Sequence, residues 1–152
     1  MSRKIVDAKK KAAGKNETIA IFPGRFQPPH LGHILTLMRM YPLYYEIIIA
    51  ISTYTYGGTK KHVMRQREVK NILEKIFEHL PKYRVIIIGK GFIERDNYDD
   101  LPKFDVVVTG NMQLINKLEK LKIKTRHQPR SKIGKLNING QMLRSLYIEE
   151  NM

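Results

Sequence analysis

The chain has 152 residues, a length that can bury one sizeable core and therefore predicts a single globular domain. It contains no cysteine, which excludes disulfides, thiolate metal sites and a cysteine nucleophile. Its 28 Lys and Arg residues against 14 Asp and Glu give a formal net charge of +14, which favours polyanionic partners such as nucleotides, nucleic acid or a membrane surface.

The apolar runs of the chain are short. The longest are EIIIAIS and RVIIIG, far below the roughly 20 residues that a membrane-spanning helix needs. No charged-then-apolar signal peptide opens the chain. We therefore expect a cytoplasmic protein without a membrane partner.

Residues 1–16 are a basic N-terminal arm without an apolar period, and we assign residues 17–152 to one folded domain. A basic run of this kind is usually a solvated tail. Binding of nucleic acid by the arm is the alternative, which we regard as the less favoured one.

In the folded part, short β-rich runs alternate with segments whose apolar residues recur at helical spacing. Pro42 and Pro81 each end a helical pattern. In chain order the patterns predict strand 18–23, a helix from Leu31, strand 45–52, a loop over 53–61, helix 69–80, strand 83–89, a polar loop over 90–102, strand 104–110, helix 114–121, edge strand 123–127 and a last short helix over 140–150. The glycine-rich part of the first of these loops is either an ordinary loop or a lid whose Lys60 and Lys61 reach phosphates.

This alternation predicts an α/β protein with a Rossmann-like, three-layer fold: a parallel five-stranded sheet with helices on both faces. Strand centres that are apolar throughout, as in 45–52, are typical of strands buried on both faces. Ligands of such sheets bind at the carboxyl ends of the strands, near the point where the strand order reverses. The residues that follow the first strand therefore become the first candidates for a site.

Those residues read FPGRFQPPHLGH (22–33). Gly24 allows close backbone approach to a ligand, and Gly32 removes bulk where the helix begins. His30 and His33 are three residues apart, so both rings can point the same way from a first helical turn. Together with Arg25 and the free N–H groups of the helix N-terminus, they indicate a phosphate-handling site. A metal pair and a purely structural role are the alternatives for the two histidines.

The stretch GRFQPPHLGH resembles the H-x-G-H signature of the nucleotidylyltransferase superfamily, in the GRFQPxHxGH form of archaeal-type nicotinamide mononucleotide adenylyltransferases and their bifunctional bacterial relatives. Two later stretches are similar to family elements in order and spacing. FDVVVTGN (104–111) resembles a strand ending in S-G-N, and NGQMLRSL (139–146) resembles the SGTxxR element that opens the last helix. The resemblance covers roughly residues 17–150.

The resemblance implies transfer of AMP from ATP to a phosphate-bearing acceptor with release of pyrophosphate, nicotinamide mononucleotide being the first candidate acceptor and NAD the product. His30 and His33 would bind the α- and β-phosphate oxygens, and Arg25 and Arg144 would hold phosphates bidentately. Mg²⁺ would arrive with ATP, since no carboxylate cluster resembles a dedicated metal site.

The implied binding residues fall into two groups. The nucleotide would contact Pro23, Gly24, Phe26, Gly32, Arg67, Thr109, Gly110, Asn111, Gln141 and Met142. The acceptor would contact Ser52, Thr53, Tyr54, Phe92 and Tyr98. Two alternatives stay open. Arg67 follows Gln66, where the family has an acid, so Arg67 could instead be a solvated helix residue. Residues 109–111 could instead be simply a strand end and helix cap.

Besides Gln66, the chain departs from the family pattern in two further features. Gln141 replaces the hydroxyl residue of the SGTxxR element, and no Trp is present to stack on a nicotinamide ring. Tyr54, Tyr56, Phe92 or Tyr98 could supply that aromatic contact. Open alternatives are therefore a related transferase that uses another acceptor (phosphopantetheine, a polyol phosphate or a sugar phosphate) or CTP, and a nucleic-acid-binding module. Homo-oligomers are common among the related enzymes, and one is possible here.

Overall fold

The computed structural model describes residues 17–52 and 64–129. Several predictions lie outside these residues: the basic arm 1–16, the loop that contains Thr53, Tyr54, Tyr56, Lys60 and Lys61, and the last helix with Gln141, Met142 and Arg144.

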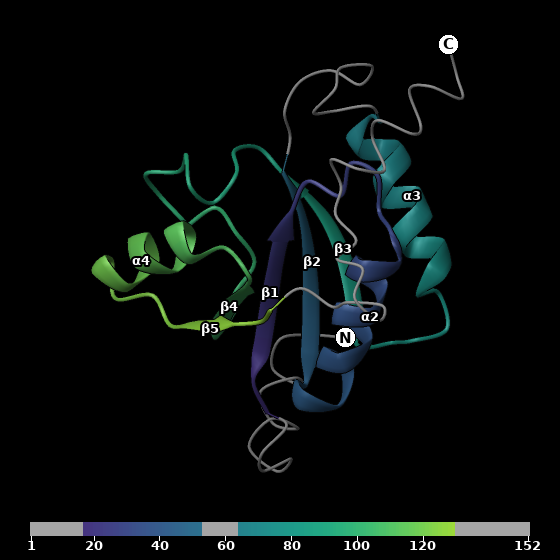
Figure 1. Ribbon diagram of the computed structural model, residues 1–152, viewed down its shortest axis with the longest axis horizontal. Helices are drawn as coiled ribbons and strands as arrows, with labels where there is room; N and C mark the ends of the chain where they lie inside the picture. The colour runs from purple at the N-terminus through teal and green to yellow at the C-terminus, as the bar shows by residue number, and fades with distance from the viewer. Residues whose placement is uncertain (1–16, 53–63, 130–152) are drawn as a thin grey trace.

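Five parallel strands form one sheet, and the predicted sheet is thereby confirmed (Figure 1). The strand order is β3-β2-β1-β4-β5, and each neighbouring pair is parallel. The strands are β1 (Ile19–Gly24), β2 (Glu46–Ser52), β3 (Tyr83–Ile88), β4 (Val106–Thr109) and β5 (Thr125–His127).

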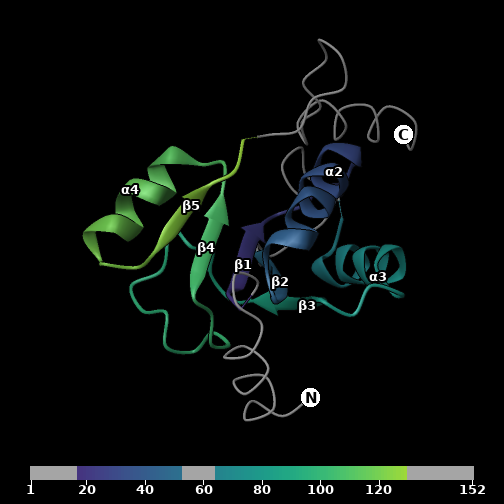
Figure 2. The ribbon, with the colours of Figure 1, turned by 90° about the horizontal axis from the view of Figure 1, so that it is seen from below.

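Helices lie on both faces of this sheet, as predicted (Figure 2). One face packs on α2 (Leu31–Met40) and α3 (Gln66–Ile76), whereas the other packs on α4 (Met112–Lys120) and on the loop between β3 and β4. The short 3₁₀ helix η2 (Tyr41–Leu43) follows α2 and contains Pro42, so the α-helix ends before the proline.

The two-sided burial of the central strands follows from the side-chain alternation of a strand. In β1, Ala20 and Phe22 point into the core beneath α2 and α3, while Ile19 and Ile21 point toward α4. All four are buried, and so is β2 from Ile47 onward. Each of these buried positions therefore has to be apolar or small.

Some element boundaries differ from the predicted ones. The last strand begins at Thr125 instead of residue 123, because Lys122 has a φ of 60° and ends α4 in a tight turn. There the N–H groups of Lys122 and Ile123 donate to the carbonyls of Glu119 and Leu118. The sheet ladder can begin only after this turn.

The boundaries of β4 and α3 also differ from the predicted ones. The strand predicted over 104–110 forms only at Val106–Thr109, because Phe104 packs under the preceding loop, near Phe92. The helix predicted over 69–80 begins at Gln66 and ends at Ile76. Its first turn is polar and exposed, so the apolar spacing did not reveal it.

Candidate active site

A cavity of about 250 Å³ opens where β1, β2 and β4 end. β1 lies between β2 and β4, so this is the point at which the strand order reverses, where ligands of open parallel sheets bind. The cavity is lined by Pro23, Gly24, Arg25, Ser52, Gly91, Phe92, Ile93, Glu94, Thr109, Asn111 and Leu114. Seven of these residues (Pro23, Gly24, Arg25, Ser52, Phe92, Thr109, Asn111) are among those that the sequence singled out.

The turn after β1 is built around Phe26. This residue has a φ of 52°, and its ring is buried. A Cβ added to Gly24 would lie 3.0 Å from that ring, so Gly24 leaves room for Phe26. The Gln27–Pro28 peptide bond that follows is cis. Gly24 and Phe26 thus have packing roles in the turn, besides any contact with a ligand.

The two histidines lie side by side at the start of α2. His30 is the N-cap residue in extended conformation, and its ring stacks on that of His33 with centroids 3.8 Å apart. The His30 N–H donates to Nδ1 of His33 at 3.2 Å. Because Nδ1 accepts this bond, the proton of the neutral His33 ring belongs on Nε2. The predicted juxtaposition of the two rings is confirmed, although His30 is mostly buried.

Gln27 is a residue of this turn that the sequence did not single out. Its side chain is 1% exposed and pairs with both backbone groups of Met64: Nε2 donates to the carbonyl, and Oε1 accepts from the N–H, each at 2.8 Å. Met64 lies two residues before α3. The Gln27 amide therefore holds the histidine turn against the beginning of that helix.

Arg67 lies in the first turn of α3, and its side chain is exposed. Because α3 follows β2 and runs antiparallel to it, the helix begins near the carboxyl ends of the strands, where the cavity opens. Arg67 itself does not line the cavity. Gly32 is buried in the first turn of α2, where its carbonyl accepts the Thr36 hydroxyl.

The end of β4 forms another wall of the cavity. Asn111 is the N-cap of α4, with its Oδ1 accepting from the N–H groups of Gln113 and Leu114, and Thr109 Oγ1 accepts from the Asn111 N–H. A Cβ on Gly110 would lie 2.9 Å from the Gln128 carbonyl oxygen, so close backbone approach explains this glycine. Asn111 therefore caps a helix and also lines the cavity.

The loop between β3 and β4 supplies the remaining wall, Gly91–Glu94. Phe92 is only 3% exposed and packs in the core, which leaves little of its ring for stacking on a ligand. Tyr98 lies outside the cavity lining, and its hydroxyl donates to the Phe92 carbonyl. Phe92 and Tyr98, two of the three predicted acceptor-binding aromatics, thus hold the loop together.

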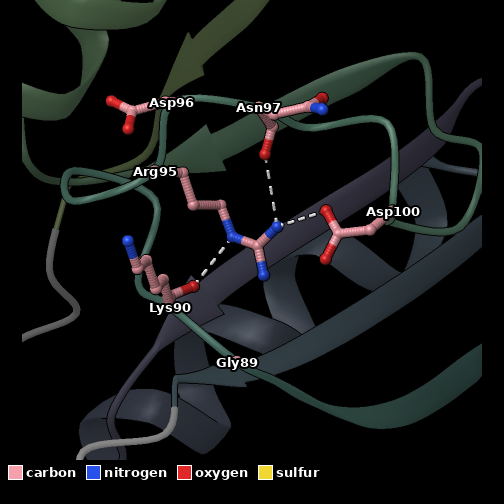
Figure 3. A pocket seen from close by; sticks show the side chains of 6 residues that line it. All are labelled: Gly89, Lys90, Arg95, Asp96, Asn97 and Asp100. Atoms are coloured by element: carbon pink, nitrogen blue, oxygen red, sulfur yellow. Dashed lines mark hydrogen bonds and ion pairs between the residues drawn. The ribbon is translucent and has the colours of Figure 1, made fainter.

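A second cavity of about 380 Å³ adjoins the same loop (Figure 3). Arg95 lies at its centre, with a nearly buried side chain that donates to the carbonyls of Lys90 and Asn97 and pairs with Asp100. Sequence reasoning did not find Arg95, since nothing in IERDNYDD distinguishes a buried arginine from a solvated one.

Among residues 17–52 and 64–129, no three His, Asp or Glu side chains gather as metal ligands would. Within the same residues, no helix is long and apolar enough to cross a bilayer.

Comparisons with known proteins agree with this architecture. A phosphopantetheine adenylyltransferase of Bdellovibrio bacteriovorus is 33% identical over 92 residues, 60% of this chain and 54% of its own. A nicotinamide-nucleotide adenylyltransferase of Sulfurisphaera tokodaii is 32% identical over 105 residues, 64% of this chain and 61% of its own. The chain thus spans about half the length of the curated relatives that it matches.

Solved structures resemble the fold. A bifunctional NMN adenylyltransferase/ADP ribose pyrophosphatase from Francisella tularensis superposes with a TM-score of 0.67 at 14% identity, covering 88% of this chain and 42% of that one. The model of the cytidylyltransferase-like family matches residues 21–145, which include the turn, the ends of β1, β2 and β4, and the whole cavity. The chain belongs to the cytidylyltransferase-like family.

Proposed function

We propose that this protein transfers AMP from ATP to a phosphate-bearing acceptor and releases pyrophosphate. The observation that carries the proposal is the stacked His30–His33 pair at the start of α2, on the turn that leads from the cavity-lining end of β1. Family membership supports nucleotidyl transfer, and relatives named as adenylyltransferases support ATP as the donor.

The proposed chemistry depends on charge stabilisation more than on proton transfer. A phosphomonoester has a second pKa near 6 and is mostly dianionic at neutral pH, so no general base is needed. An oxygen of the acceptor phosphate attacks the α-phosphorus of ATP. The bond from that phosphorus to the bridging oxygen breaks, and pyrophosphate leaves with the electron pair. Catalysis therefore comes from positioned donors that draw the two anions together.

The residues of the turn suit this task. His33, with its proton on Nε2, can donate to a phosphate oxygen, and the first turn of α2 offers further N–H donors. Arg25 is exposed and lines the cavity, where its guanidinium can pair with a phosphate. Arg144, Gln141 and Met142 keep their proposed roles toward ATP from the sequence resemblance.

For the acceptor, we propose nicotinamide mononucleotide first and phosphopantetheine second. The GRFQP form of the turn and the relative named nicotinamide-nucleotide adenylyltransferase favour the first. The relative named phosphopantetheine adenylyltransferase favours the second, as does the absence of Trp from the chain. Ser52 lies at the end of β2 and lines the cavity. Among the predicted acceptor-binding residues that the structure describes, it offers a polar side chain there.

We also propose that a divalent cation, Mg²⁺, enters with ATP. A Francisella tularensis enzyme of similar fold was solved with AMP and a manganese ion, which supports a divalent cation of this kind. The charge of the ion would offset the negative charge of the leaving pyrophosphate.

The test is pyrophosphate release from ATP and Mg²⁺ in the presence of nicotinamide mononucleotide, phosphopantetheine or other phosphate acceptors. We expect release with one acceptor, and we expect His33→Ala to lower kcat by about 10²–10³, the usual effect of losing one donor to a developing oxyanion. His79→Ala is the matched control, because the His79 side chain is 91% exposed and distant from the cavity lining.

Each result has a distinct meaning. Release with phosphopantetheine alone would keep the chemistry and exchange the acceptor. Binding of ATP without release for any acceptor would contradict the proposal and favour a nucleotide-binding protein without turnover. Binding of nucleic acid with a steep dependence on salt would favour the remaining alternative.

A further inference from the structure

The loop between β3 and β4 forms one wall of the active-site cavity without belonging to any helix or strand. Its residues Gly91–Glu94 line the cavity, yet no sheet ladder or helical hydrogen bonds hold them. The position of this wall therefore depends on the packing of Phe92 in the core and on side chains that bind the backbone of the loop.

Two of these side chains belong to the loop itself. Arg95 reaches the carbonyls of Lys90 and Asn97 and pairs with Asp100 (Figure 3). The Tyr98 hydroxyl donates to the Phe92 carbonyl. These contacts give the loop its own shape, but they do not attach it to the rest of the site.

Lys117 makes a polar attachment to the rest of the site, in addition to the packing of Phe92 in the cluster that contains Leu114 and Leu118. Its Nζ donates to the carbonyl oxygens of Phe92, at 3.3 Å, of Ile93 and of Arg95. An ammonium group has three N–H donors, and all three are matched by carbonyls of this loop. The sequence separation is 22 to 25 residues, so the contact is tertiary.

Lys117 lies on α4, the helix that carries another wall of the cavity. Asn111, the N-cap of α4, and Leu114, one turn before Lys117, both line the cavity. The ammonium of Lys117 therefore ties the loop wall directly to the helix wall. Without it, the separation of the two walls would no longer be set by a direct bond.

We propose that Lys117 is a positioning residue that fixes the width of the nucleotide cavity by holding the loop wall against α4. The inference rests on the proposed function. Lys117 itself does not line the cavity, so it acts through the carbonyls of Phe92 and Ile93. A preformed cavity binds its ligand without a cost of ordering the loop, so Lys117 raises nucleotide affinity and contributes little to the chemical step.

The test compares Lys117→Met with Lys120→Met in the chain of 152 residues. Lys117→Met keeps most of the aliphatic stem and removes the three donors, whereas Lys120 is an exposed lysine at the end of the same helix and controls for the lost charge. For each variant, thermal unfolding checks the fold, amide hydrogen exchange reports on residues 90–98, and calorimetry gives the Kd of Mg-ATP. Steady-state kinetics then separate KM from kcat.

For Lys117→Met we expect faster amide exchange in residues 90–98 and about a tenfold rise in the Kd and KM of ATP with kcat unchanged, the pattern of lost uniform binding. Lys120→Met should resemble the wild-type protein. Lys117→Arg, whose planar fork cannot match three carbonyls, should restore the charge but not the affinity.

Two results would overturn the inference. One is equal exchange and equal affinity in Lys117→Met and Lys120→Met. The other is full recovery by Lys117→Arg, which would assign the effect to charge instead of position. A wild-type protein that binds ATP without turning over any acceptor would instead contradict the proposed function, while the exchange and affinity comparison would still decide the role of Lys117.

Discussion

At the scale of single residues, Tyr83 shows how a half-buried polar group joins two elements. Its hydroxyl, at the start of β3, donates to the Leu37 carbonyl of α2 at 2.6 Å, and its ring packs against Phe77 and Tyr41. Burial raises the pKa of Tyr83 above its ordinary value, and the neighbouring Tyr41 raises it further. The neutral hydroxyl is therefore the form that the fold requires.

Tyr83→Phe tests this requirement. At pH 7 the variant should lose about 1 kcal/mol in the free energy of unfolding, because the Leu37 carbonyl loses its donor. The raised pKa contributes stability that is complete below about pH 10 and is lost as pH rises further, since the unfolded chain ionises there first. The difference between wild type and variant, measured by urea unfolding from pH 7 to 11, should thus narrow above pH 10. A constant difference would contradict the raised pKa.

At the scale of elements, the site depends on how the turn after β1 is joined to α3. Gln27 binds both backbone groups of Met64, just before the helix that carries Arg67. The histidine turn and the start of α3 are therefore joined by two buried hydrogen bonds. Gln27 is not among the cavity-lining residues, yet a substitution there should disturb the histidine turn, which we propose to bind phosphate.

Gln27→Glu is the sharpest change, because it keeps the size of the side chain and replaces the Nε2 donor by an oxygen that faces the Met64 carbonyl. We expect a loss of roughly 1–3 kcal/mol in the free energy of unfolding, the cost of an unsatisfied buried polar group, together with weaker ATP binding. Urea unfolding and calorimetry provide the two measurements. Gln113→Glu, the same change at an exposed position of α4, should have little effect on stability. Similar losses in both variants would argue against the Met64 contact.

At the scale of the whole molecule, the net charge of +14 should speed the encounter with ATP. The cavity lies at the carboxyl ends of the strands, and Arg25 lines it. Salt screens the attraction between the positively charged protein and the approaching ATP, with a Debye length of about 10 Å at 0.1 M and about 3 Å at 1 M.

Salt should therefore slow the association of ATP much more than its dissociation. Stopped-flow binding of ATP between low and high NaCl concentration measures both rates. Adenosine is the matched control, because it has no phosphate, and its association should be insensitive to salt. An equal effect of salt on both ligands would contradict electrostatic steering.

The sequence alone predicts the alternation of strands and helices, the parallel sheet, and the place of the histidine turn at the end of the first strand. These features follow from side-chain period and chain connectivity, which are local properties of the chain. For His30 and His33, the spacing of three residues predicted that both rings can point the same way, and the structure adds that the rings stack.

The polar residues that hold the site together can be identified only in the folded chain. Gln27, Arg95 and Lys117 bind backbone groups, as far as 37 residues away for Gln27, and a backbone carbonyl has no signature in the sequence of its partner. Packing decided the roles of Phe92 and Tyr98 in the same way, because burial of an aromatic ring depends on what the fold brings against it. The chemical groups of the turn thus come from residues that are neighbours in the sequence, whereas the width of the cavity is set by contacts between distant segments.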